Sequence, residues 1–526
     1  MKNESEVNYM EIKNETKFKK LSSTAEASAD SSVDYVLPDY LGDVKRILFT
    51  ECEARAASHF SSEDREELSG IVVYNVVYLD AENKISSASF TSDYDTEIKT
   101  HQPSSVQCVG SPRVNAYNVR LVGPRKFSAK AAVVTSLRVV SEDLIATGGS
   151  AYECDDEPIT ATRVLKIHSS SASERVEREY AEVLERLEGS IADEVAVVYS
   201  SADIVFDGVT AGDGEATVKG NLILSAVISD ADAPIYIVEK RIPIEERVPF
   251  ADIDAEMTFI PEGTVVSLTS QVNADDTGAE VVLSAVVEYA VIGEYNEHVS
   301  VTADAYLKTR PTENTYSDYH YSELSGSVSV SEIVASVVTR EELLGEGLRE
   351  IVYARPTVKI ESMCAEDGRA RIKGEMKLAG VGSISDEQGE ISYSAVKYSS
   401  PFEVYVKCPC DESSSVSCSL YASGASFMID GDSVRVSANL LGNVSVSKMG
   451  CERVLVCCDA AEQEYVQSSG TITVYYPDSD ETLFSVAKKF HTTPEKIAKD
   501  NSLTETVGVV SGMEQTLGSG KRILIY

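Results

Sequence analysis

The strongest constraint on the fold is a pair of markers that recurs three times along the 526-residue chain. A glycine that opens or interrupts an apolar, strand-like run occurs at Gly70, Gly220 and Gly374, at spacings of 150 and 154 residues. A Ser-Ala pair follows each glycine after 58, 64 and 63 residues, starting at Ser128, Ser284 and Ser437. Two markers in constant order and at nearly constant spacing predict three copies of one structural unit.

The runs around the markers have the pattern of antiparallel strands. Val, Ile and Tyr alternate with polar residues, and turns rich in Asp, Asn or Gly separate the runs, as at 80–83 and 386–389. This combination is typical of β-hairpins. We therefore expect a mainly β protein with three antiparallel β-rich repeat domains, each a sandwich or a curled sheet. The three domains are expected over residues 33–143, 198–301 and 354–460.

The segments outside the repeats have a different pattern. Residues 144–197 and 302–353 are expected to be spacers, and the run 174–187 has helical spacing with many i,i+4 charge pairs. Residues 331–348 show a weaker helical pattern. Such a helix would either cover a sheet edge or form a rigid linker. Residues 1–32 are polar and rich in Ser and Ala, which predicts a mobile N-terminal arm.

Residues 471–526 carry signals in the order strand, helix, helix, strand. An alternating run over 472–476 predicts a half-buried strand. Apolar residues at i, i+3, i+4 and i+7 from Leu483 predict a helix. Thr493 and Pro494 are the residue types favoured at the N-cap and at the first position of a helix, so they predict the start of a second helix. The apolar run 523–525, which follows two glycines, predicts the last strand.

This C-terminal stretch resembles a LysM domain. The matching residues are Asp480-Glu-Thr-Leu-Phe484, Val486-Ala487, Lys489-Phe490, Thr493-Pro494, Asn501, Gly520 and Ile523-Leu-Ile525. The usual Gly-Asp of the motif is Asp480-Glu481 here, and the stretch 504–517 is longer than most loops of the family at this place. The resemblance implies a βααβ fold with a shallow groove for N-acetylglucosamine polymers of the peptidoglycan or chitin type. The groove, for glycan or for a protein partner, is implied at Asp480, Glu481, Thr482, Leu483, Asn501, Ser502 and Leu503.

Charge and hydropathy narrow the possible partners and location. The formal net charge is −38, which repels nucleic acid and anionic lipid, so no nucleic-acid partner is expected. The start of the chain lacks the apolar core of a signal peptide. No run reaches the ~18 apolar residues of a membrane helix, so we expect a cytoplasmic protein without membrane insertion.

No catalytic residue, cofactor or metal site is expected. The six histidines form no His-Glu-x-x-His motif, and the Gly518–Arg522 stretch matches a P-loop only in part. The ten cysteines are expected to be reduced thiols. Cys408 and Cys410 are expected on one face of a strand, and their spacing is not that of paired zinc ligands. A hydrolase within the β body, with no recognisable nucleophile, is the remaining enzymatic alternative.

The body has a resemblance of its own. Val36-Leu-Pro-Asp-Tyr40, Val44-Lys-Arg-Ile-Leu48 and the repeated strands are similar to clostridial proteins with SPOCS repeats, formerly a domain of unknown function. Three such units before a LysM domain imply a non-enzymatic spore-coat scaffold in the mother-cell cytoplasm, at the forespore surface. Its LysM tip would dock on a SpoIVA-like coat morphogenetic protein. The alternative is a peptidoglycan-binding protein of the cell wall or spore cortex, which would leave the cell by an unrecognised route.

Overall fold

The computed structural model describes most of the chain between residues 10 and 526. Outside the described residues are 1–9, 12–13, 63–64, 100–106, 148–149, 152–156, 189–194, 231–232, 252, 255, 276–277, 344–347, 386–390, 467–471, 504–516 and 518–521. The expected turn at 386–389 and the glycines before the last strand lie there.

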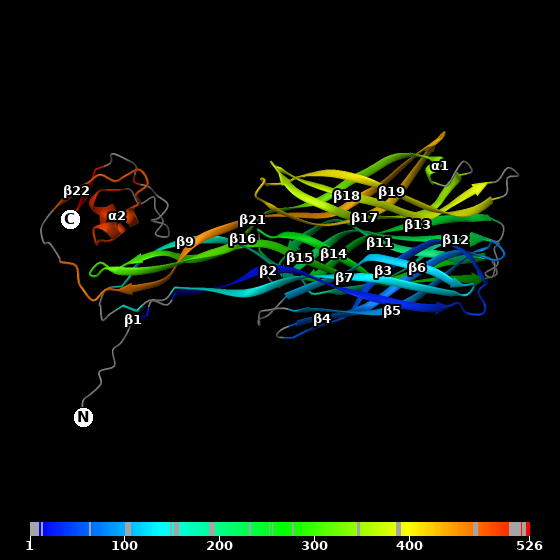
Figure 1. The fold of residues 1–526 in the computed structure, drawn as a ribbon, viewed down its shortest axis with the longest axis horizontal. Helices are drawn as coiled ribbons and strands as arrows, with labels where there is room; N and C mark the ends of the chain where they lie inside the picture. The colour runs from blue at the N-terminus through cyan, green and yellow to red at the C-terminus, as the bar shows by residue number, and fades with distance from the viewer. Residues whose placement is uncertain are drawn as a thin grey trace, which may run out of the picture.

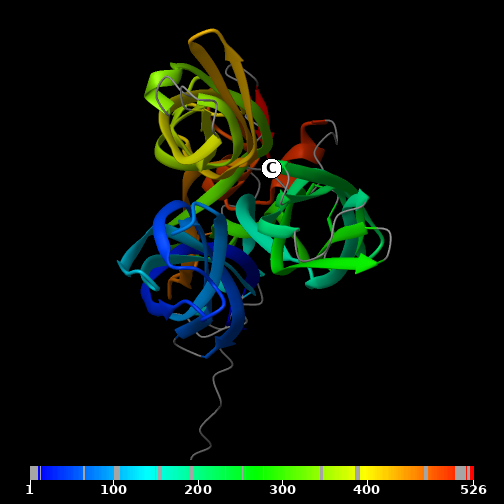
Figure 2. The same cartoon turned by 90° about the vertical axis from the view of Figure 1, so that its right-hand side faces the viewer.

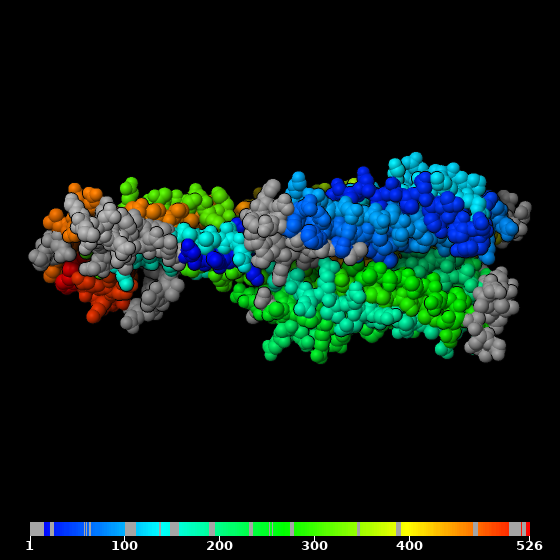
Figure 3. All heavy atoms as spheres, turned by 90° about the horizontal axis from the view of Figure 1, so that it is seen from below, coloured from blue at the N-terminus to red at the C-terminus, as the bar shows by residue number. Residues whose placement is uncertain are grey.

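One strand order occurs three times along the chain. Each time, two antiparallel sheets are formed: β2-β7-β6 with β3-β4-β5, β10-β15-β14 with β11-β12-β13, and β16-β21-β20 with β17-β18-β19. Five of these sheets have three strands, and the β10-β15-β14 sheet has a fourth, β9, which also pairs with β15. We call these units the first, second and third lobes. Figure 2 shows the three lobes arranged around a common axis. Figure 3 shows the first lobe (blue) and the second lobe (green) side by side along the molecule.

The strand bounds are as follows. The first lobe has β2 (Asn14–Val36), β3 (Val44–Ser61), β4 (Arg65–Asp80), β5 (Ile85–Lys99), β6 (Gln107–Gly123) and β7 (Lys126–Thr147). The second lobe has β9 (Ile159–Ala172), β10 (Val176–Glu188), β11 (Ala196–Gly212), β12 (Glu215–Asp230), β13 (Ala233–Pro249), β14 (Thr258–Asp275) and β15 (Gly278–Tyr306). The third lobe has β16 (Thr312–Thr339), α1 (Arg340–Leu343), β17 (Leu348–Glu366), β18 (Arg369–Ser385), β19 (Ile391–Lys407), β20 (Ser415–Asp430) and β21 (Ser433–Ala460). A short pair, β1 (Met10–Glu11) and β8 (Ser150–Ala151), completes the body.

An apolar core lies between the two sheets of each lobe. In the second lobe, Leu222 and Leu224 of β12 share a cluster with Val281 and Leu283 of β15. Every second side chain of β15 is buried from Ala279 to Tyr289, as the period of two of a strand requires. The Ser-Ala markers lie in β7, β15 and β21, where the alanine faces the core.

The recurring glycines have a shared structural reason. Gly220 of β12 pairs with Phe206, where β11 has a β-bulge. A Cβ at Gly220 would overlap the carbonyl oxygen of Val205. Gly70 and Gly374 lie opposite corresponding bulges in β3 and β17, and a Cβ there would overlap a backbone carbonyl in the same way. Only glycine fits this close approach of two strands.

Long strands leave the lobes together and form a narrow stalk. The stalk consists of residues 14–21 with 140–147, 159–172 with 292–306, and 312–324 with 447–460. An apolar cluster that includes Phe18, Leu165 and Val454 joins the three strand pairs. Figure 1 shows the stalk leading from the lobes to a small C-terminal unit.

That unit, which we call the tip, contains β22 (Thr473–Tyr475), α2 (Leu483–Lys489), α3 (Pro494–Asp500) and β23 (Ile523–Ile525). β22 and β23 pair antiparallel, and both helices contribute side chains to one core. Ile497 of α3 is buried there, as the sequence pattern indicated.

The prediction of a helix over residues 174–187 is wrong. These residues belong to β10, which pairs with β15. Val176, Tyr180, Leu184 and Leu187 all pack against the lobe core, a spacing that imitates a helical face. A β-bulge at Leu184 causes this spacing, because the extra residue changes which side chains face the core.

The expected mobile arm and spacers also need correction. Residues 14–32 are not an arm, because they form most of β2 and pair with β7. The expected spacers 144–197 and 302–353 contain β9, β10 and β16, which are strands of the lobe sheets and the stalk. Among the described residues of the weak helical pattern at 331–348, Arg340–Leu343 are helical and 331–339 belong to β16. Polar residues are tolerated in these strands because each strand exposes one face to solvent.

Candidate functional sites

The two tip helices begin at threonine caps. The Thr482 hydroxyl accepts a hydrogen bond from the Ser485 N–H, and the Ser485 hydroxyl accepts one from the Thr482 N–H. This reciprocal pair is a capping box. At α3 the Thr493 hydroxyl accepts from the Lys496 N–H, with Pro494 at the first helical position, as predicted.

An asparagine holds the end of α3 against β23. The Asn501 amide donates to the carbonyl oxygens of Ile497 (2.9 Å) and Leu524 (2.7 Å). Its own oxygen accepts from the Leu524 N–H at 2.6 Å. The side chain therefore joins two elements that the 504–516 stretch separates in sequence.

The tip packs against the end of the stalk. The rings of Tyr306 and Phe484 meet edge to face with centroids 5.2 Å apart, and the Tyr306 hydroxyl donates to the Thr492 carbonyl at 2.6 Å. Lys488 Nζ lies 2.6 Å from Asp304 Oδ2. An apolar contact and a charge-assisted hydrogen bond thus connect α2 with β15.

Four of the seven groove residues suggested by the sequence have roles within the fold. Leu483 is buried in the tip core, Thr482 caps α2, and Asn501 holds β23. The Glu481 carboxylate accepts hydrogen bonds from the Tyr475 hydroxyl and the Asp478 N–H. The hydrogen bond from Tyr475 is the main reason that the pKa of Glu481 is lowered.

The other three lie at or near the surface. Asp480 and Ser502 are exposed, and half-buried Leu503 packs in the same apolar cluster as Leu483. The two predicted groove segments therefore approach each other through their leucines. A ligand-binding role for these residues stays a prediction.

The outer face of the tip sheet is apolar and exposed. Ile472, Val474, Tyr476 and Tyr526 expose 60%, 49%, 60% and 55% of their surfaces. The alternating run 472–476 suggested that Ile472 and Val474 face the core. Instead, Tyr475 packs on the helices, and Ile472 and Val474 face outward. We call these four residues the tip stripe.

A second candidate site lies where the lobes meet on their common axis. Phe49, Tyr199 and Tyr353 contact one another there, with ring centroids 4.8 to 5.7 Å apart. They come from β3, β11 and β17, each beside a β-bulge, at the same 150- and 154-residue spacings as the glycines. The junction therefore has approximate threefold symmetry at this level.

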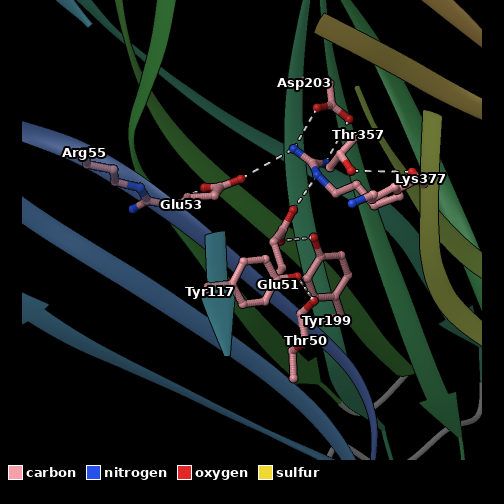
Figure 4. Close-up of polar contacts among 10 residues, drawn as sticks. Thr50, Glu51, Glu53, Arg55, Tyr117, Tyr199, Asp203, Thr357 and Lys377 are labelled. Atoms are coloured by element: carbon pink, nitrogen blue, oxygen red, sulfur yellow. Dashed lines mark hydrogen bonds and ion pairs between the residues drawn. The ribbon is translucent and has the colours of Figure 1, made fainter. Parts of the chain in front are cut away.

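Two residues further along the same strands the symmetry is lost. The equivalent positions hold Glu51, Ser201 and Arg355. Arg355 Nε contacts the Glu51 carboxylate, and Nη2 lies 2.9 Å from Asp203 Oδ1 and 3.4 Å from Glu53 Oε1. Figure 4 shows these carboxylates converging from the strands of two lobes. We call Glu51, Glu53, Asp203 and Arg355 the junction cluster.

Glu51 is the most perturbed carboxylate of the junction cluster. It is 8% exposed, and the Tyr199 hydroxyl donates to it. Burial raises the pKa of Glu51 to about 7, although the Arg355 guanidinium acts in the opposite direction. Glu53 and Asp203 add to the increase, because neighbouring negative charges favour the protonated form.

Two clefts reach Glu51 from different sides. One, of about 410 Å³, lies between the first and third lobes and is lined by Tyr117, Lys377 and Tyr398 among others. The second, of about 360 Å³, lies between the first and second lobes and is lined by Glu53, Arg55 and Ser201 among others.

Sequence reasoning did not identify the junction cluster. The sequence does contain a sign of this cluster. Glu51, Ser201 and Arg355 have the same spacings as the recurring glycines, so they occupy one equivalent position in the three repeats. An acid and a base at equivalent positions of neighbouring units indicate a contact between those units. The abundance of carboxylates in the chain hides this pair from a search for motifs.

Other sequence features were also located. The Sγ atoms of Cys408 and Cys410 lie 3.5 Å apart and both residues are buried, so the thiols share one side of the chain. The expectation that they lie in a strand is wrong, because both follow the end of β19 at Lys407. In the described part of the chain, no group of three His, Cys, Asp or Glu residues is placed to hold a metal ion. Of the helices described, none is long and apolar enough to cross a membrane.

No family model, no curated protein and no solved structure matches this chain.

Proposed function

We propose that this protein is a non-enzymatic scaffold of spore-coat assembly, with three SPOCS-like lobes and a LysM-like tip that docks on a coat morphogenetic partner. The observation that carries this proposal is the tip stripe. Four large apolar side chains are exposed on one sheet face, at the opposite end of the stalk from the lobes. Exposed apolar side chains gathered on one face mark a surface that binds another molecule.

A protein partner fits the tip stripe better than a polar ligand does. Val474 lies in β22, and Ile472 and Tyr476 flank that strand with the same alternation, which suits burial against an apolar surface or an added strand. Among the described residues, β22 and β23 pair only with each other, so each has an edge on which a partner strand can pair.

The proposal is tested with the full chain in sporulating cells. A tagged protein should form a ring around the forespore, and the purified chain should bind a SpoIVA-like partner. Val474→Asp should lose the ring and at least tenfold in affinity, because a charge in a buried apolar contact has no partner. Thr473→Asp, which adds the same charge to the same strand beside the stripe, is the matched control. Equal loss in both variants, or no loss in either, would contradict docking through the tip stripe.

Peptidoglycan or chitin-type glycan binding is the alternative, and it requires a different surface. It predicts that the chain sediments with purified cell wall and that Asp480→Ala weakens this sedimentation. Asp480 is suited to the test because it is exposed, so its replacement leaves the tip core intact. Wall binding that needs Asp480 but not Val474 would replace the docking proposal with the glycan one.

A further inference from the structure

We propose that the junction cluster is a pH-sensitive latch, in which protonated Glu51 holds the three lobes together and ionised Glu51 loosens them. The inference concerns the lobe body and does not depend on what the tip binds. It starts from the geometry of the axis. Glu51 is buried where β3, β11 and β17 meet, and its two oxygens contact Arg355 of the third lobe and Tyr199 of the second. One carboxyl group of the first lobe thus contacts both other lobes.

The charges of the junction cluster and the neighbouring Arg55 balance only when Glu51 is neutral. Arg355 is shared by Glu51, Glu53 and Asp203, and Arg55 Nη2 lies 3.3 Å from Glu53. Two guanidinium groups therefore face three carboxyl groups. With Glu51 protonated, two positive charges meet two negative charges. With Glu51 ionised, one unbalanced negative charge is buried between the lobes, which is costly in a region of low dielectric constant.

Among the described residues, Arg355 is the one cation in direct contact with Glu51. The titratable groups that face it or line its two clefts are Cys52, Glu53 and Arg55 on β3, Tyr117 on β6, Tyr199 and Asp203 on β11, Tyr353 and Arg355 on β17, Lys377 on β18, and Lys397 and Tyr398 on β19. Lys377 Nζ lies 3.1 Å from Glu375, so that lysine is already paired. The two clefts give water, and therefore protons, a path to the carboxyl group.

The direction of the effect follows from proton linkage. In the closed junction the pKa of Glu51 is raised from 4.5 to about 7. The closed form therefore binds this proton more tightly than an opened form in which water surrounds Glu51. The contribution of Glu51 to closure is largest below about pH 4.5 and is lost progressively as the pH rises through about 7.

Amide hydrogen exchange of the full chain tests the latch. After correction for the intrinsic effect of pH on exchange, protection of β3, β11 and β17 should fall roughly tenfold between about pH 5.5 and about pH 8. Glu51→Gln keeps a neutral side chain of the same shape, so its protection should stay constant over this range. Asp203→Asn removes one of the competing carboxylates, so the fall should persist but its midpoint should move to lower pH.

Two comparison variants make the result decisive. Glu332→Gln removes an exposed carboxylate of the third lobe and should behave as the parent chain. Glu262 is a rival, because burial raises its pKa as well. The latch is overturned if Glu51→Gln retains the fall in amide protection with rising pH, or if Glu262→Gln abolishes that fall. If Glu51→Gln does not fold, an unshifted midpoint in Asp203→Asn would overturn it equally.

Discussion

At the scale of single residues, several side chains that look like ligand contacts are parts of the fold. Asn501 makes three hydrogen bonds, one to α3 and two to β23, and Leu483 lies in the tip core. The recurring glycines have a comparable role, because Gly220 allows β11 to approach where its bulge brings the Val205 carbonyl close. A residue that recurs or matches a motif can therefore be required for packing alone.

Gly220→Ala should destabilise the second lobe by about 1–3 kcal/mol, because the added methyl group overlaps backbone atoms that cannot move independently. Gly123→Ala is the control, since nothing lies within 4 Å of a Cβ there, and its effect should stay within about 0.5 kcal/mol. Urea unfolding measures both free energies of unfolding, and amide exchange in β11 and β12 shows whether the effect of Gly220→Ala lies in the second lobe. Equal free energies of unfolding for the two variants would show that the bulge does not require glycine.

At the scale of elements, the spacing of apolar residues was misleading in one strand and reliable in the tip helices. β10 imitates a helix because of its bulge, whereas α3 begins at Thr493 as its cap signal indicated. Local hydrogen bonds explain the difference. A threonine cap acts on its own helix, but a bulge depends on the partner strand.

Thr482→Ala should weaken α2 by about 1 kcal/mol, because the Ser485 N–H loses its hydrogen-bond acceptor. Thr482→Ser retains a hydroxyl and should remain close to the parent chain. Exchange of the α2 amides is the measurement. If Thr482 served only a ligand, both variants would leave exchange unchanged in the absence of ligand.

At the scale of the whole molecule, three lobes, a stalk and a tip are held by contacts between distant segments. The lobes meet at Phe49, Tyr199 and Tyr353, and the tip meets the stalk at Tyr306 and Lys488. Both junctions combine aromatic rings with charged groups. Charged groups give such junctions a dependence on pH or salt that an apolar core lacks.

Lys488→Met should loosen the tip from the stalk by about 1 kcal/mol, because Asp304 loses its cationic partner while both side chains remain partly exposed to water. The loss should be largest at low salt, where the ion pair is screened least. Lys489→Met is the control, since this neighbouring lysine pairs with Glu481 inside the tip. Amide exchange at the end of β15 reports on the contact. Equal exchange in the two variants would exclude a role for the ion pair.

The sequence by itself determined what depends on neighbouring residues: alternating strands, the Asp80 turn, the threonine caps and the recurrence of one pattern along the chain. Two of the groove candidates from the sequence, Asp480 and Ser502, are exposed at the tip surface, and a ligand for them is still a prediction. The tertiary structure alone decided that β2, β9, β10 and β16 belong to sheets, because their polar and bulged sequences become strands only through pairing with β7, β15 and β21. It also brought Glu51 and Arg355 together from opposite ends of the body. Burial and distance between such residues arise only when the lobes pack, so no local pattern encodes them.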